Sequence, residues 1–88
     1  MKTLDTVKPG ETVFVARVDS EGAIRRRLLD LGLTPGTKAL VRKVAPMGDP
    51  IELYLRGYEL TIRAEDARKI IVNGGKDEDS FNRQSKFR

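Results

Sequence analysis

Few side chains of this 88-residue chain could carry out chemistry, because histidine and cysteine are both absent. Their absence removes the usual general base near neutral pH and the commonest ligands for zinc and iron. Ser20 has no obvious activating base, so no nucleophile–base pair can be assembled. We therefore expect a protein that is not an enzyme, with no catalytic residues, no metal ligands and no cofactor.

Two short segments near the C-terminus contain residue types that can bind ions. Gly74-Gly75-Lys76 resembles part of a phosphate-binding loop, but it lacks the leading glycine and the spacing of that motif, and no helix follows it. Asp77-Glu78-Asp79 offers hard oxygen ligands without the spacing of a calcium loop. We interpret the two segments as a flexible linker and a solvated acidic patch.

The strongest local concentration of positive charge is the run Arg25, Arg26 and Arg27. On a helix these side chains span about 200°, since each step turns about 100°, so they cannot all contact one phosphate backbone. We expect either a solvated helix face, paired in part with Asp30 or Glu21, or a docking surface for an acidic partner. Nucleic acid is disfavoured, because single-strand binders interleave basic residues with stacking aromatics, which are scarce here.

The net charge of +4 is spread over a surface in which acidic residues are scattered among basic ones. No apolar run approaches the ~18 residues of a membrane span, and the start of the chain has no signal-peptide pattern. We therefore expect a cytoplasmic location, no membrane insertion and no nucleic-acid partner.

The elements that must position these residues are short β-strands. Hydrophobic alternation and β-branched residues predict strands over residues 11–18, 38–45, 51–55, 58–62 and 69–72. Arg56-Gly57 should join the third and fourth strands as a hairpin. Its core-facing residues should be Ile51, Leu53, Leu55, Tyr58, Leu60 and Ile62. Tyr54 then lies on the outer face, where it packs across the strands or anchors a partner peptide.

One longer helix is predicted over residues 21–31, capped by Asp19-Ser20, and a single helical turn over residues 64–68. Ile24, Leu28 and Leu31 recur at helical spacing and should face the core. Gly32 should end the helix in a left-handed conformation, with Leu33 packing back toward Leu28.

Six glycine and proline residues are predicted to set turns. Thr34-Pro35-Gly36-Thr37 suits a type II turn, and residues 46–50 form a tight loop that carries Met47 and Asp49. The predicted turn residues are Gly32, Pro35, Gly36, Gly48, Pro50 and Gly57.

Five short strands with one helix between the first and second predict a mainly β fold, a small five-stranded SH3-like barrel over residues 1–72. Residues 73–88 are too polar to bury a core and are expected to form a disordered tail. Exposed edge strands in so small a barrel also allow weak self-association.

Three segments, residues 26–37, 45–51 and 56–63, resemble the FeoA family in order and spacing. The second segment, APMGDPI, is close to the family's APLGDPI. The resemblance implies an SH3-like barrel with a helical insert, similar to the C-terminal barrel of diphtheria-toxin-repressor-type regulators. It also implies a bacterial accessory protein of ferrous iron uptake that binds the cytoplasmic GTPase part of a FeoB-type transporter. The family also carries the term transition metal ion binding.

The residues expected to bind that partner are exposed ones: Arg25, Arg26, Arg27, Met47, Asp49 and Tyr54. Two other functions stay open. One is a metal-linked regulatory domain that binds a peptide segment, as in iron-dependent repressors. The other, less favoured, is a nucleic-acid-binding barrel.

Overall fold

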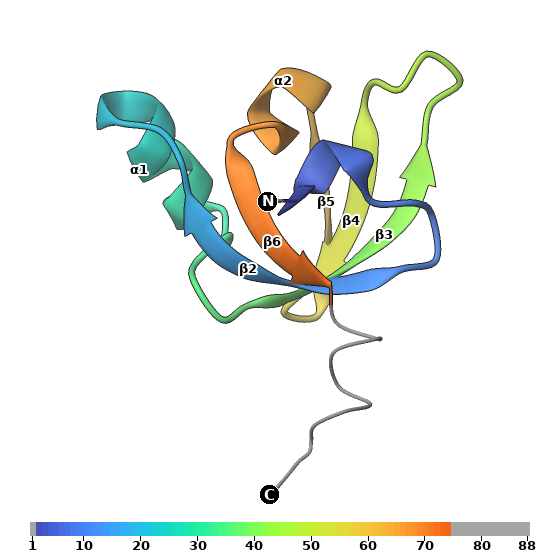
Figure 1. Ribbon diagram of the computed structural model, residues 1–88, viewed down its shortest axis with the longest axis horizontal. Helices are drawn as coiled ribbons and strands as arrows, with labels where there is room; N and C mark the ends of the chain where they lie inside the picture. The colour runs from blue at the N-terminus through green and yellow to red at the C-terminus, as the bar shows by residue number, and fades with distance from the viewer. Residues whose placement is uncertain (1, 75–88) are drawn as a thin grey trace, which may run out of the picture.

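The computed structural model describes residues 2–74 as one six-stranded antiparallel sheet with two short helices (Figure 1). The sheet order is β1-β6-β2-β3-β4-β5. The strands are β1 (Lys2–Thr3), β2 (Thr12–Val18), β3 (Lys38–Val44), β4 (Ile51–Leu55), β5 (Tyr58–Ile62) and β6 (Ile70–Gly74). The connections hold α1 (Gly22–Asp30), α2 (Ala64–Ala67) and a 3-10 turn, Leu4–Thr6. The mainly β class is confirmed, with six strands instead of five.

The additional strand, β1, is two residues long and pairs with β6, Lys2 opposite Val72 and Thr3 opposite Ile71. Two residues carry no measurable period, so hydrophobic alternation could not predict this strand. At its other end β6 runs to Gly74, beyond the expected start of the tail at residue 73, and Gly74 lies opposite Val13. Residues 75–88 of the expected tail lie outside the described residues.

The core lies on the concave side of the curved sheet and is closed at one end by α2 and the 3-10 turn (Figure 1). The alternation predicted for β4 is confirmed, because its three odd-numbered residues are buried and Tyr54 is exposed. The large side chains with less than 2% exposure are Leu4, Leu28, Leu33, Ile51, Leu53, Leu55, Ile70, Val13, Val15 and Val41.

The β4–β5 hairpin turns through Arg56 and Gly57, with φ of 50° and 86°. Positive φ at both central residues gives the tight two-residue turn that matches the twist of the strands. The expectation that Tyr58 faces the core was wrong, because the side chain is 41% exposed. β5 is an end strand of the sheet, and the Tyr58 hydroxyl leaves the core to donate a hydrogen bond to the Leu31 carbonyl.

The C-terminal end of α1 has the predicted geometry. Gly32 has a φ of 106°. Its N–H donates to the Leu29 carbonyl at 2.9 Å, and the Leu33 N–H donates to the Leu28 carbonyl at 3.2 Å. These two bonds form the Schellman ending, and both Leu28 and Leu33 are fully buried.

The N-terminal end of α1 differs from the prediction. Glu21 is the residue before the helix and makes no side-chain cap bond, so the expected cap at Asp19-Ser20 was wrong. Ile24 is 40% exposed, although its spacing from Leu28 predicted a core position. Only the last turns of α1 pack on the sheet, and the first turns stand away from it (Figure 1). Helical spacing fixes the face on which Ile24 lies, but not how far the core extends along that face.

Candidate functional site

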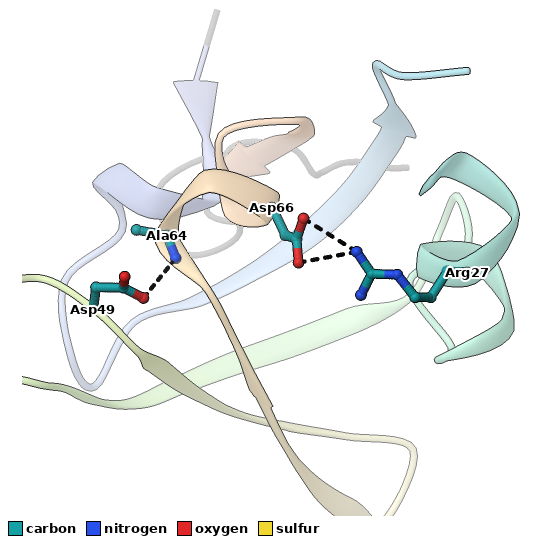
Figure 2. Close-up of polar contacts among 4 residues, drawn as sticks. All are labelled: Arg27, Asp49, Ala64 and Asp66. Atoms are coloured by element: carbon teal, nitrogen blue, oxygen red, sulfur yellow. Dashed lines mark hydrogen bonds and ion pairs between the residues drawn. The ribbon is translucent and has the colours of Figure 1, made fainter. Parts of the chain in front are cut away.

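The three consecutive arginines of α1 have different environments. Nη2 of Arg27 lies 3.3 Å from Oδ2 and 3.4 Å from Oδ1 of Asp66 on α2 (Figure 2). The Arg27 side chain is 53% exposed and that of Asp66 only 8% exposed. Arg27 therefore pairs with a buried carboxylate on the other helix, instead of with the expected Asp30 or Glu21.

Arg25 and Arg26 stay exposed, and within residues 2–74 neither forms a salt bridge or side-chain hydrogen bond. Ile24 lies on the same exposed end of α1, and the three side chains span about 200° of the helix surface, so a partner must enclose this end to contact all of them. An exposed hydrophobic side chain next to uncommitted arginines is a composition that protein interfaces favour. We call Ile24, Arg25 and Arg26 the helix patch.

Asp49 has a structural contact that its sequence position did not reveal. Its Oδ1 accepts a hydrogen bond from the Ala64 N–H at 2.9 Å (Figure 2). Ala64 begins α2, so the carboxylate satisfies one of the unpaired N–H groups of the first turn and lies at the positive end of the helix. Asp49 thus fastens the β3–β4 loop to α2.

Met47 lies in the loop between β3 and β4 and is 91% exposed. The loop is tight, because Gly48 has a φ of 84° and its N–H donates to the Ala45 carbonyl at 2.7 Å. Figure 1 shows this loop and α1 on opposite sides of the molecule. Met47 and the helix patch therefore cannot belong to one compact contact.

Tyr54 lies on the outer face of the sheet and is 39% exposed. The strand register places it in one row with Thr12, Leu40 and Glu59. The Arg42 guanidinium lies 5.8 Å from the Tyr54 ring centroid and forms a salt bridge with Glu59 at 3.6 Å. The ring is thus held by cross-strand neighbours and by a cation–π contact.

An open hollow of about 280 Å³ lies beside Tyr54, and we call it the outer groove. Half-buried Leu40 and the ring of Tyr54 supply apolar surface, and the exposed Lys38 and Arg56 bring two positive charges to it. Its lining residues are Thr12, Lys38, Leu40, Tyr54, Leu55 and Arg56. Apart from Tyr54, sequence reasoning missed these residues, because they come from three strands whose register the sequence does not give.

Arg56 also links the hairpin to the end of α1. Its Nη2 donates to Oγ1 of Thr34 and of Thr37, each at 2.8 Å, and its Nε donates to the Gly32 carbonyl at 3.3 Å. The cation therefore lies where the partial negative charge of the helix terminus is greatest. The 34–37 turn has the expected type II features, with Gly36 at a φ of 91° and the Thr37 N–H bonded to the Thr34 carbonyl at 3.0 Å.

Residues 2–74 contain no group of three or more acidic side chains placed to hold a metal ion. No helix in the same range is long and apolar enough to cross a membrane. The acidic run 77–79 and most of Gly74-Gly75-Lys76 lie outside the described residues.

Comparison with known proteins identifies the family of this chain. The model of the FeoA domain matches residues 2–74. The FeoA protein from Chlorobium tepidum is 42% identical, with a TM-score of 0.79 over 88% of this chain and 73% of that one. A fusion of Fe(2+) transport protein A with the Fe(2+) transporter FeoB from Porphyromonas gingivalis is 33% identical over 69 residues. That match covers 78% of this chain, which spans only 8% of the length of the fusion protein.

More distant structures show the fold alone. FeoA from Stenotrophomonas maltophilia, described as a procaryotic SH3 domain protein and solved with zinc, is 23% identical with a TM-score of 0.74; the match covers 83% of this chain and 91% of that one. A manganese-dependent transcriptional repressor is 20% identical with a TM-score of 0.76; the match covers 83% of this chain and 36% of the repressor. The SH3-like architecture and its likeness to repressor domains are therefore confirmed.

Proposed function

Because the chain belongs to the FeoA domain family, we propose that it is a non-enzymatic accessory protein of ferrous iron transport that binds the cytoplasmic GTPase part of a FeoB-type transporter. The observation that carries this proposal is the relative in which an Fe(2+) transport protein A segment and FeoB form one polypeptide. Fusion holds two modules at high effective concentration. It supports the view that the modules also make contact when they are separate chains.

We place the docking surface at the helix patch. Arg25 and Arg26 are free to pair with carboxylates of a partner, and Ile24 would bury its 40% exposed side chain in the contact. Arg27 and Asp49, which the sequence also suggested as contacts, bond within the molecule to Asp66 and to the Ala64 N–H, so we assign them no direct contact in this docking surface. Met47 and Tyr54 lie on other elements, where they would serve a second contact at most.

Calorimetric titration of the full chain with the isolated GTPase domain tests the proposal. We expect micromolar binding that weakens at high salt, and a loss of about tenfold or more in Arg25→Glu/Arg26→Glu, because reversed charges in an interface repel. Lys8→Glu/Arg63→Glu is the matched control, since it makes the same change in net charge at exposed positions outside α1. Wild-type protein that fails to bind at tens of micromolar would refute the proposal, and equal losses in both variants would refute the surface.

The alternative of a metal-linked, peptide-binding domain rests on the repressor-like fold. It predicts that ferrous or manganous ion shifts a defined set of NMR signals at stoichiometric concentration. The accessory function predicts weak shifts scattered over carboxylate residues.

A further inference from the structure

The outer groove combines apolar surface with positive charge and is open to solvent. Leu40 and the ring of Tyr54 form its apolar part, and the charges come from Lys38 and Arg56. The described bonds of Arg56 use Nε and Nη2. The two N–H groups of Nη1 are therefore left for a carboxylate. A fitting occupant would have an aromatic side chain close to several carboxylates.

The described chain ends close to this groove. Gly74 lies opposite Val13, Val13 opposite Ala39, and Ala39 opposite Leu55, which lines the groove. Gly74 and Leu55 are therefore three strand spacings apart, about 14 Å. Figure 1 shows β6 ending at the same end of the sheet as the β4–β5 turn. Anything that follows Gly74 starts within reach of the groove.

The sequence after Gly74 has the required chemistry. Asp77, Glu78 and Asp79 are three successive carboxylates, and Phe81 follows two residues later. At about 3.3 Å per extended residue, the carboxylates can lie about 10–17 Å from Gly74 and Phe81 about 23 Å away. Lys38 and Leu40 lie on β3, two strand spacings or about 10 Å from β6, so the carboxylates can reach Lys38 and Phe81 has enough chain to lie on Leu40 and Tyr54.

We propose that residues 77–81 bind the outer groove of their own molecule. The carboxylates pair with Lys38 and Arg56, and the Phe81 ring packs on Leu40 and Tyr54. Each contact is weak by itself. Covalent attachment at Gly74 supplies an effective concentration in the millimolar range, so a weak site is occupied.

The exposed arginines of α1 are a less suitable target for the same carboxylates. α1 follows Val18, whereas Gly74 pairs with Val13, five residues back along β2. That separation adds about 17 Å to the path. Arg25 and Arg26 also lack an aromatic neighbour, and the groove has Tyr54. A partner segment of acidic and aromatic character would have to displace residues 77–81 before it could use the groove.

Paramagnetic NMR on the full chain tests this proposal in the absence of any partner. The chain has no cysteine, so Asn82→Cys gives a single site for a nitroxide spin label next to the proposed segment. At low salt we expect strong signal loss at the amides of Lys38, Leu40 and Tyr54. The amides of α1, at the far side of β2, should keep their intensity. High salt should restore the groove signals, because screening weakens the exposed ion pairs.

Matched variants separate the two kinds of contact. Asp77→Asn/Glu78→Gln/Asp79→Asn should reduce the signal loss in the groove several-fold, without the need for salt. Phe81→Ala should also reduce it, whereas Phe87→Ala removes the same side chain outside the segment and should leave it unchanged. Equal effects of the two phenylalanine variants would refute the packing of Phe81 in the groove.

Three outcomes would overturn the proposal. One is signal loss that is absent or uniform over residues 2–74, and a second is loss centred on α1. The third comes from a mixture of isotope-labelled protein without a nitroxide and unlabelled protein with the nitroxide. Signal loss in this mixture as strong as in the singly labelled sample would overturn the proposal. The segment would then bind a second copy instead of its own molecule.

Discussion

The two ends of α1 belong to one nine-residue helix but differ in every contact. At the C-terminal end Leu28 is fully buried, Gly32 completes a Schellman ending, and Arg56 and Tyr58 donate hydrogen bonds to the last carbonyls. At the N-terminal end residues 21–26 are all exposed, and Glu21 provides no side-chain cap. The helix is therefore held to the sheet at one end and presented to solvent at the other.

This difference separates the residues that hold α1 to the sheet from those that we propose contact a partner. Residues near Leu28 determine how firmly the helix is attached. Residues near Arg25 can change with little effect on the fold, which leaves them available for a partner. The following predictions test that division, in order of decreasing effect on the free energy of unfolding.

The largest effect is expected from Leu28→Ala, which leaves a cavity under the attached end of α1. We expect a loss of about 2–5 kcal/mol in the free energy of unfolding, measured by urea denaturation. Ile24→Ala is the control on the same helical face, and its loss should be well below that of Leu28→Ala, because Ile24 is already 40% exposed. Similar losses of unfolding free energy for the two variants would contradict the division of α1 into an attached end and an exposed end.

Arg27→Ala should destabilise the protein by about 1–3 kcal/mol, because it leaves the Asp66 carboxylate buried without its partner. The double variant Arg27→Ala/Asp66→Ala should recover part of this stability loss, and a double-mutant cycle measures how much of it comes from the pair. Arg26→Ala, one position away and exposed, is the control and should have almost no effect.

Gly32→Ala should cost about 1–2 kcal/mol, since an L-residue is disfavoured at positive φ. A Cβ there would also meet the Tyr58 hydroxyl oxygen at 3.0 Å. Gly22→Ala at the other end of α1 tests the same backbone strain, because Gly22 has a φ of 63° and nothing within 4 Å of its Cβ position. Thermal unfolding should rank Gly32→Ala as the less stable variant.

The smallest effect is expected from Arg25→Ala/Arg26→Ala. Exposed side chains without partners contribute within about 0.5 kcal/mol, so the urea midpoint should stay close to that of the wild type. A loss above about 1 kcal/mol would show that the helix patch has a structural function and would weaken its assignment to a partner.

Local patterns predicted much of this fold. The β4 alternation, the ending of α1 at Gly32 and the turn at Arg56-Gly57 each depend on residues within a few positions of one another. The backbone preferences of glycine and the two-residue period of a strand are sufficient to define such features.

Contacts between distant residues could not be predicted in the same way. The Arg27–Asp66 pair joins residues 39 positions apart, and Asp49 reaches Ala64 over 15 positions. The outer groove requires the register of three strands, which a single sequence does not give. The exposure of Ile24 depends on where the core ends, which is also a property of the assembled sheet.

The pairing of β1 with β6 brings the two ends of the folded region together. Lys2 lies opposite Val72, so their Cα atoms are about 5 Å apart. A fold that starts and finishes at neighbouring points can be spliced into a longer polypeptide, or appended to one, without separating its strands. The same ends would also tolerate a direct genetic link, which makes circular permutation of this domain feasible.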